Sequence, residues 1–259
     1  MTDPLPDEAW GFEWGDADGN GGFVRLALHR AQRIAWFWAY LWQPRAGPVV
    51  VRDHEVTLPR GAALEIRADA LWSELVCETP GEHWSIGLEA FGVRLDDAED
   101  ARHGEIGERI ALGFDFEWER TGAVCASELG GVTFDEQPGV VRGEILLGRD
   151  RIPLDTVGRF EHSIGAVDGP DPVSRHTFAW DDGSWQSGRS STAGSVGCRW
   201  PAAGAADGDP LDGADGSGTV LHGVLATALI PMGDRVATRS LGPATSEGRT
   251  GVCWMESVA

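Results

Sequence analysis

The sequence contains no lysine: all 21 of its basic residues are arginine, against 41 aspartates and glutamates. The absence of lysine excludes chemistry that needs a side-chain amine, including Schiff-base formation, a pyridoxal anchor and the phosphate-binding lysine of a Walker motif. The formal net charge of −20 argues against nucleic acids and anionic membrane surfaces as partners, because binding to phosphates requires basic patches. We therefore expect a small-molecule ligand and no nucleic-acid partner.

Long apolar runs and the features of a signal peptide are also missing. No stretch approaches the roughly 18 apolar residues of a membrane-spanning helix, and the first ten residues, "MTDPLPDEAW", are acidic. The four cysteines are widely spaced and form no C-x-x-C pair: Cys77, Cys125, Cys198 and Cys253. We expect a cytoplasmic protein without membrane insertion, whose cysteines are free thiols acting as small buried apolar residues.

Several catalytic motifs are absent, including G-x-S-x-G, H-E-x-x-H and a G-x-G-x-x-G that follows a strand. The segment "DADGNG" (16–21) begins like a calcium loop, but its twelfth position is Ala27 and a strand follows, which favours a hairpin turn. The Asp-rich segment 207–216 is either a weak cation site or a solvated loop. We therefore expect no metal and no cofactor, and the oligomeric state stays open.

The dominant hydrophobic period is two, which predicts β-strands. Turn clusters rich in Gly, Pro and Asp separate the strands at intervals of about 8–12 residues. A single short helical turn is expected, at 95–102. Strands are predicted at 22–29, 34–42, 62–69, 69–78, 83–95, 109–120, 139–147, 175–182 and 219–230.

The number of predicted strands, about fourteen, suits two consecutive antiparallel β domains better than one. We place the domains at 1–130 and 131–259. A Gly-, Ala- and Asp-rich segment at 201–218 is predicted to be a mobile surface loop of the second domain.

The stretch "IAWFWAYLWQP" (34–44) is apolar on both faces if it is a strand, with Trp36, Trp38, Tyr40 and Trp42 sharing one face. A strand that is apolar on both faces must be covered on both. One hypothesis is a core strand at the interface between two barrels. The other is the aromatic wall of a ligand cavity.

The stretch "GFDFEWER" (113–120) shows the same alternation, with acidic residues on its second face. We expect Phe116 and Trp118 to point inward, beside Trp36. Indole rings at such a wall could stabilise a developing positive charge or stack on a conjugated substrate.

Polar residues gather at the ends of strands in "VGRFEHSIGAVDGPDPVSRHTFAWDDG" (157–183). An acid or imidazole in an apolar cavity has a perturbed pKa, and a carboxyl group that stays protonated can donate a proton to an alkene. The alternative is that Glu161 and His162 satisfy a strand end. Our candidate catalytic residues are Glu161, His162 and Asp182.

The segment "FDEQPGVVRGEILLGRDRIPLDTVGRFEHSIGAVD" (134–168) resembles the carotenoid 1,2-hydratase-like superfamily, as do "PGEHWSIGLEAFGVRLDD" and "GERIALGFDFEWERTG" upstream. The resemblance implies two lipocalin-like, calycin-type β-barrels around an apolar cavity. Glu161-His162-Ser163 would match the family's acid-His-polar turn, and Trp180-Asp181-Asp182 its later aromatic and acidic residues. Ile164 stands where the family usually has Trp, which departs from the carotenoid-hydratase pattern.

Together these features predict an enzyme of natural-product biosynthesis that cyclises a polyunsaturated isoprenoid or polyketide without a cofactor. The alternatives are a hydratase of isoprenoid C=C bonds, a non-catalytic carrier of a hydrophobic metabolite, and a structural β protein whose tryptophans all fill the core. The expected substrate-binding residues are Trp36, Trp38, Tyr40, Phe116, Trp118, His176 and Trp180.

Overall fold

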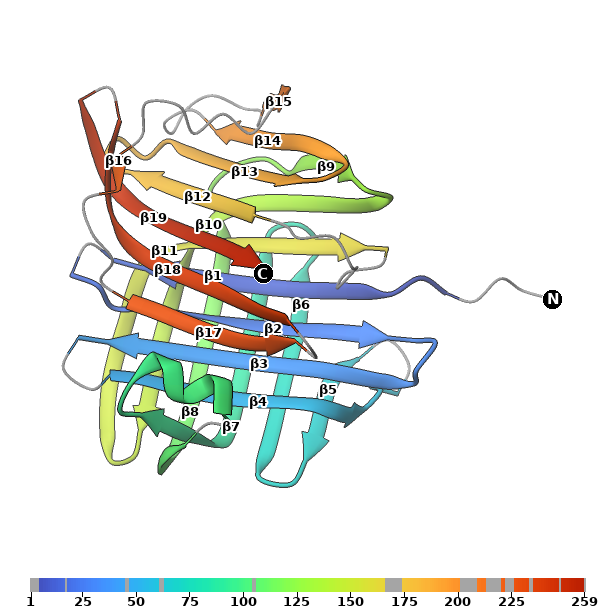
Figure 1. Cartoon of the computed structure of the whole chain (residues 1–259), viewed down its shortest axis with the longest axis vertical. Helices are drawn as coiled ribbons and strands as arrows, with labels where there is room; N and C mark the ends of the chain where they lie inside the picture. The colour runs from blue at the N-terminus through green and yellow to red at the C-terminus, as the bar shows by residue number, and fades with distance from the viewer. Residues whose placement is uncertain are drawn as a thin grey trace.

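The computed structural model describes residues 5–16, 18–44, 47–60, 63–103, 106–165, 174–200, 209–212, 220–221, 226–232, 235–246 and 248–258. These residues form two antiparallel β-sheets and one short 3-10 helix, η1 (Ala98–His103) (Figure 1). The prediction of an all-β protein is confirmed, and η1 lies where one helical turn was expected. No helix among these ranges is long and apolar enough to cross a membrane.

The first sheet contains eleven strands in the order β4-β3-β2-β1-β11-β10-β8-β7-β6-β5, with β9 paired to β10. The sheet closes on itself because β4 also pairs with β7, so we call it the first barrel. Its strands are β1 (Glu8–Gly15), β2 (Gly21–His29), β3 (Ile34–Gln43), β4 (Gly47–Thr57), β5 (Leu64–Ala68), β6 (Leu71–Thr79), β7 (His83–Leu95), β8 (Gly107–Arg120), β9 (Cys125–Leu129), β10 (Val132–Leu147) and β11 (Asp150–Ile164).

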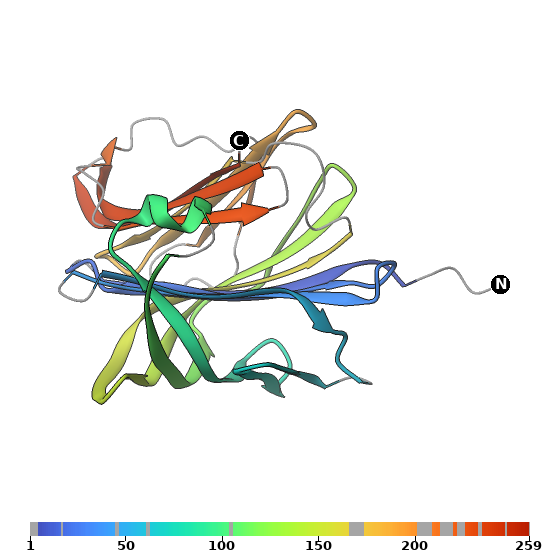
Figure 2. The same cartoon turned by 60° about the horizontal axis from the view of Figure 1, so that its bottom comes forward.

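The second sheet contains eight strands in the order β15-β14-β13-β12-β19-β18-β16, with β17 paired to β18. It packs over the outer face of the first barrel. Figure 2 shows β1–β4 as a middle layer between the second sheet and the rest of the barrel. Its strands are β12 (Ser174–Trp180), β13 (Trp185–Ser191), β14 (Gly194–Trp200), β15 (Asp209–Asp212), β16 (Val220–Leu221), β17 (Ala226–Met232), β18 (Arg235–Ser246) and β19 (Arg249–Val258).

The change from one sheet to the other falls between Ile164 and Ser174. The domain boundary predicted between residues 130 and 131 lies in the turn that joins β9 to β10, inside the first sheet. The two-domain division at residue 130 stays a prediction. The hydrogen bonding of the two sheets divides the chain further along the sequence, between Ile164 and Ser174. Within the predicted mobile loop 201–218, Asp209–Asp212 form β15, and the other positions lie outside the described residues.

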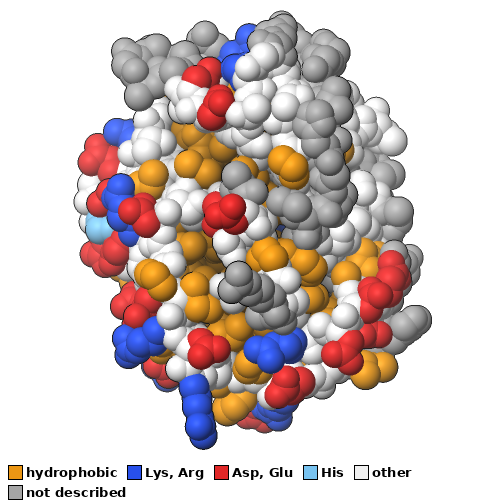
Figure 3. All heavy atoms as spheres, turned by 90° about the vertical axis from the view of Figure 1, so that its left-hand side faces the viewer, with side chains coloured by type: hydrophobic (Ala, Val, Ile, Leu, Met, Phe, Trp, Pro, Cys, Tyr) orange, Lys and Arg blue, Asp and Glu red, His pale blue; other side chains and the backbone are white. Residues whose placement is uncertain are grey.

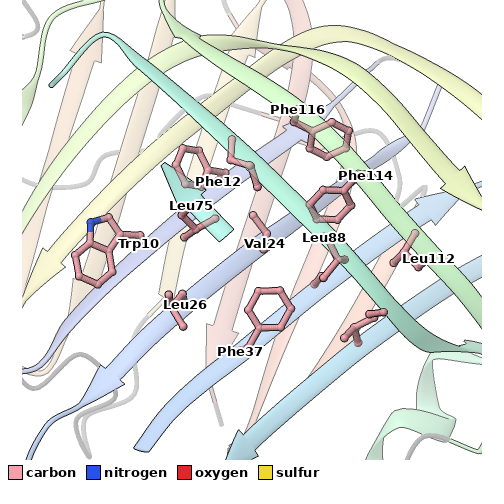
Figure 4. Packing of buried hydrophobic residues seen from close by; sticks show 14 of the residues in the cluster. Trp10, Phe12, Val24, Leu26, Phe37, Leu75, Leu88, Leu112, Phe114 and Phe116 are labelled. Atoms are coloured by element: carbon pink, nitrogen blue, oxygen red, sulfur yellow. The ribbon is translucent and has the colours of Figure 1, made fainter. Parts of the chain in front are cut away.

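Inward-facing residues of the strands pack together in the interior of the first barrel and leave space at one end. Phe12, Phe37 and Phe116 are each at most 1 % exposed, and Figure 4 shows aliphatic side chains packed between the aromatic rings. Trp10 lies at one end of this cluster in the same view. Alternation along each strand places these residues inside and polar residues outside, which is the period-two pattern of the sequence.

Many charged side chains lie on the outer surface, where they form exposed ion pairs such as Arg142 with Glu119 (2.7 Å). Figure 3 shows acidic and arginine side chains intermingled with apolar ones on one side of the molecule. The hairpin turn expected at 16–21 is confirmed, because the Asp16 carboxylate accepts hydrogen bonds from the backbone nitrogens of Asp18 and Asn20 at 2.9 Å.

The prediction that every cysteine is a free thiol is wrong for two of them. Cys125 on β9 and Cys198 on β14 form a disulfide that links the two sheets, with their Cα atoms 6.1 Å apart. The bonded residues are 73 positions apart in sequence, so their spacing gave no sign of the pairing. Cys77 and Cys253 are free.

Candidate functional site

The three candidate catalytic residues do not form one site. Glu161 and His162 are consecutive on β11, so their side chains point to opposite faces of the first sheet. Glu161 faces the second sheet, whereas His162 lies on the barrel side beside Trp10. Asp182 lies in the exposed turn between β12 and β13, where its Oδ1 accepts hydrogen bonds from the backbone nitrogen and the hydroxyl of Ser184. These hydrogen bonds lower the pKa of Asp182.

Glu161 is 2 % exposed and lies among arginines. Its Oε2 is 2.9 Å from a guanidinium nitrogen of each of Arg159, Arg175 and Arg189. Burial by itself would raise the pKa of Glu161, but these arginines hold it well below its ordinary value. The residue therefore carries a negative charge at neutral pH and cannot be the protonated carboxyl that the sequence hypothesis required.

The charges around Glu161 extend into a network that joins the two sheets, which we call the ion network. Arg159 contacts Glu136 at 2.7 Å, and Arg175 contacts Glu256 at 2.9 Å. Each carboxylate in it is paired with at least two guanidiniums, and a buried charge is tolerated only when it is paired. The network consists of Glu13, Glu136, Glu161, Glu256, Arg25, Arg159, Arg175, Arg189 and Arg239.

The aromatic face of β3 lies in the seam between the first barrel and the second sheet. Trp38 and Tyr40 are buried, Trp36 packs against them, and the Tyr40 hydroxyl donates a 2.6 Å hydrogen bond to the Thr227 carbonyl of β17. A cavity beside Tyr40, bordered by both sheets, has a volume of about 30 Å³. A water needs about 10–15 Å³ of such volume, so this cavity has room for about two waters. The rings therefore fill this seam, as the barrel-interface hypothesis for this strand expected.

Phe116 and Trp118 do not lie beside Trp36, so that expectation is wrong. Both are inside the first barrel, at 1 % and 0 % exposure, because β8 pairs with β7 and β10 on the barrel's other wall. Trp36 faces outward from the barrel. His176 and Trp180 belong to β12 of the second sheet, where both rings pack on Phe178.

The first barrel has a hollow of about 620 Å³ at one end. This volume lies within the range of about 300–1,000 Å³ that is typical of small-molecule sites. Two indole rings and several leucines border it, and charged residues lie at its rim. The bordering residues are Glu8, Trp10, Leu28, Arg30, Leu58, Pro59, Ala63, Leu64, Glu74, Leu75, Val76, Cys77 and Trp84.

His162 is the candidate catalytic residue that contacts a residue bordering this hollow. Its ring stacks on Trp10 with centroids 5.0 Å apart and an interplanar angle of 18°. Burial lowers the pKa of His162, although the carboxylates of Glu8 and Asp135 oppose the shift. The imidazole is thus neutral at pH 7, and its Nε2 is buried without a hydrogen-bond partner.

The polar rim of the hollow is ordered by the start of β1. Arg30 forms an ion pair with Glu8 at 2.7 Å, and its backbone nitrogen donates to the Asp7 carboxylate at 2.8 Å. The exposed thiol of Cys77 is also at the rim. The charge of Arg30 is therefore matched locally, and the apolar character of the hollow comes from its leucines and indoles.

Sequence reasoning missed Trp10 and Trp84. The available signal for Trp10 was the alternation in "AWGFEW" (9–14), which is the same period that singled out β3. Trp84 stands in a predicted strand, but no local pattern distinguishes a ring at the open end of a barrel from one in its interior. That distinction depends on where the facing strands end.

A family model described as "Domain of unknown function (DUF7064)" matches residues 1–189. The chain belongs to this family. The match covers the whole first barrel together with β12 and most of β13. No curated protein sequence matches the chain.

Three solved structures resemble this family member over almost its full length. A protein assigned as AttH from Nitrosomonas europaea has a TM-score of 0.59 and 10 % identity, covering 98 % of this chain and 92 % of its own. Kievitone hydratase from Nectria haematococca has a TM-score of 0.58 and 7 % identity, with coverages of 98 % and 89 %. CghA bound to Sch210972 has a TM-score of 0.51 and 9 % identity, with coverages of 99 % and 88 %.

Identities of 10 % or less show a shared fold and nothing finer. The double lipocalin-like architecture that the sequence resemblance implied is thereby confirmed.

Proposed function

We propose that this protein is an enzyme that binds a hydrophobic, polyunsaturated small molecule in the hollow of the first barrel and cyclises it. The hollow of about 620 Å³ carries the proposal, because it is ligand-sized and bordered by two indoles and four leucines. Support for a reaction, beyond binding, comes from the shared fold with a hydratase and with CghA. The proposed mechanism uses the side chains of the chain alone.

Shape supplies the first part of the proposed mechanism. A flexible polyene loses conformational freedom when it closes a ring, and a rigid apolar pocket can impose the folded conformation before the bond forms. Trp10 and Trp84 offer flat faces on which conjugated double bonds can stack. An intramolecular cyclisation converts π bonds into σ bonds without any other reactant, so its atoms balance within the substrate.

His162 supplies the second part. Its neutral imidazole lies against Trp10, and its unpartnered Nε2 can exchange a hydrogen bond with a polar group of the substrate. Such a bond would polarise the substrate or take up a proton during ring closure. Glu161 would act from the other face of β11, by anchoring the strand that carries His162.

Hydration of a C=C bond is the second candidate function. The exposed thiol of Cys77 at the rim shows that this end of the hollow meets solvent, so water can reach a bound alkene. In that reaction one water adds across the double bond, its hydrogen to one carbon and its hydroxyl to the other. The resemblance to kievitone hydratase favours this candidate.

The experiment is incubation of the purified protein with a panel of linear trienes and isoprenoid polyenes, followed by mass spectrometry and tryptophan quenching. Cyclisation gives a product of unchanged mass with shortened conjugation, and hydration adds the mass of one water. Quenching without any product supports the carrier instead.

A matched pair of variants locates the site. Leu64→Trp replaces a leucine that borders the hollow with a larger, indole-bearing side chain. Leu146→Trp makes the same replacement on the exposed outer face of β10. We expect Leu64→Trp to weaken polyene binding and turnover at least about tenfold, while Leu146→Trp leaves both unchanged. Equal behaviour of the two variants would place the site elsewhere.

A further inference from the structure

Four residues that neighbour Phe160 carry a buried polar atom without a hydrogen-bond partner: Trp84 Nε1, Trp118 Nε1, Gln137 Oε1 and His162 Nε2. Trp84 is 7 % exposed and Gln137 is 2 % exposed, so surface water does not satisfy them. An unpaired buried donor or acceptor costs roughly 1–3 kcal/mol. Because Trp84 borders the ligand-sized hollow, these unpartnered atoms point to a polar ligand group that completes hydrogen bonds there.

Trp84 and Trp118 belong to β7 and β8, Gln137 to β10, and His162 to β11, which also carries Phe160. The Trp84 ring lies 5.3 Å from the Phe160 ring, and Trp84 also borders the hollow. Gln137 on β10 is the cross-strand partner of Phe160 on β11, and His162 lies two residues further along β11 on the same face.

Gln137 also approaches the turn that precedes Trp84. A Cβ atom built on Gly81 would stand 3.8 Å from Gln137 Nε2. The amide of Gln137 and the indole of Trp84 therefore lie at the same end of the first barrel.

The chemistry of Trp84 and Gln137 selects the ligand atom. An indole N–H can only donate a hydrogen bond, and an amide oxygen can only accept one. A hydroxyl group does both at once, accepting from Trp84 and donating to Gln137. A carbonyl group can only accept, and a hydrocarbon can do neither.

We propose that the substrate of the first barrel is a hydroxylated polyene, an alcohol or enol whose oxygen is bound between Trp84 and Gln137. This inference rests on the proposed function, because it deepens the specificity of the same hollow. His162 lies two residues from Phe160 on the same face of β11. Gln137 and Trp84 are thus specificity-determining residues, and the leucines bind the hydrocarbon chain.

The experiment compares three probes of closely similar polyene structure: all-trans-retinol, all-trans-retinal and anhydroretinol. Their dissociation constants are measured by quenching of tryptophan fluorescence. The chain has no lysine, so retinal cannot form an imine with a lysine side chain. We expect retinol to bind at least about fivefold more tightly than the other two, since one buried hydrogen bond contributes roughly 1 kcal/mol or more.

Conservative variants assign the preference to the two residues. Gln137→Met keeps the length of the side chain and removes its amide, and Trp84→Phe keeps a ring and removes the N–H. Each should bring the affinity for retinol to that for anhydroretinol, whose own affinity should change less than about twofold. Trp14→Phe is the control, since its unpartnered Nε1 belongs to a ring packed against Phe114 and Phe116 in the core.

Equal affinities of the wild-type protein for the three probes would overturn the inference while leaving the hollow as a binding site, and this result does not depend on any variant folding. A preference for retinol that survives both Gln137→Met and Trp84→Phe would also overturn it. If none of the three probes binds, both this inference and the proposed function are contradicted.

Discussion

At the scale of single residues, the alternation along β11 decides what each side chain can do. Arg159, Glu161 and Ser163 face the second sheet, and Phe160 and His162 face the first barrel. Two neighbours in sequence therefore work in different surroundings. Glu161 is held as a charged carboxylate by its arginine neighbours, and His162 is a neutral imidazole that stacks on Trp10 at the edge of an apolar hollow.

We predict that His162→Asn lowers turnover of a bound polyene by about 10²–10⁴-fold with little change in its dissociation constant. Because burial lowers the pKa of His162 below its ordinary value of 6.5, the active neutral form persists across neutral pH. Turnover should stay constant above pH 6.5 and fall as the pH drops through the lowered pKa. Steady-state kinetics against pH measures both effects.

His176→Asn is the matched control, because His176 is also buried with an unpartnered Nε2 but lies on the second sheet. It should retain turnover. Loss of turnover in the His176 variant with retention in the His162 variant would move the site to the second sheet.

Cys77 gives a direct probe of the hollow. Its thiol is exposed at the rim, whereas Cys253 is buried with a raised pKa and Cys125 and Cys198 are bonded to each other. A bulky maleimide should therefore label Cys77 alone and block polyene binding. Labelling by mass spectrometry and binding by tryptophan quenching check this, with Cys77→Ser as the variant that should bind normally and resist the reagent. Unchanged affinity of the labelled protein would speak against the hollow as the binding site.

At the scale of strands, the two-sided apolar character of β3 follows from its place between two layers. Phe37 and Leu41 pack inside the first barrel, and Trp38 and Tyr40 pack against η1 and β17. The strand therefore needs no ligand to cover its aromatic face. Packing between two layers is thus sufficient to explain the alternating aromatic residues of β3, which resemble the wall of a ligand site.

Close strand packing in the second sheet gives a prediction about Gly251 on β19. A Cβ atom at this position would stand 2.1 Å from the Ala179 carbonyl oxygen of β12, which is backbone and cannot move aside. Gly251→Ala should lower the free energy of unfolding by about 1–3 kcal/mol. Gly11→Ala on β1 is the control, since its nearest atoms would be 4.0 Å away. Urea unfolding of both variants measures the difference, and equal losses would contradict the packing described here.

At the scale of the whole molecule, the ion network and the disulfide hold the second sheet on the first barrel. Arg175, Arg189 and Arg239 come from the second sheet and contact carboxylates of the first. Replacing one charged residue of such a buried network lowers the free energy of unfolding strongly, because the remaining partner is left buried and unpaired. The network thus fixes β11, and with it His162, relative to the second sheet.

The network predicts a specific loss of stability in acid. Its arginines outweigh the effect of burial and lower the pKa of Glu256 to about 2, from an ordinary value of 4.5. A group whose pKa is depressed by folding stabilises the protein above its unfolded pKa and loses that contribution as the pH falls through the folded pKa. The contribution of Glu256, about 3 kcal/mol, should therefore be complete above pH 4.5 and vanish near pH 2.

Glu256→Gln measures this contribution. At pH 7 it should lower the free energy of unfolding by about 3–5 kcal/mol, and the difference from wild type should shrink as the pH falls below 4.5. Glu119→Gln removes an exposed carboxylate and should cost at most about 1 kcal/mol. A pH-independent difference for Glu256→Gln would show that the carboxylate contributes through packing instead of charge.

The sequence by itself determined the class of fold and the places of most strands. Period-two alternation and turn residues are local properties, so they identified the β2, β3, β7 and β8 segments without any knowledge of their neighbours. The resemblance at 134–168 added the double lipocalin-like architecture. The residue types suited to an apolar ligand, above all tryptophan, were visible from composition.

Only the tertiary structure decided which face of each strand meets a cavity, a second sheet or water. Alternation divides a strand into two faces but does not say what covers them, because the covering strands are distant in sequence. Tyr40 therefore lies against the second sheet, Trp84 borders a hollow, and Glu161 contacts arginines from β12 and β13. The charge states followed from those contacts, since burial and neighbouring charges set a pKa only once the chain has folded.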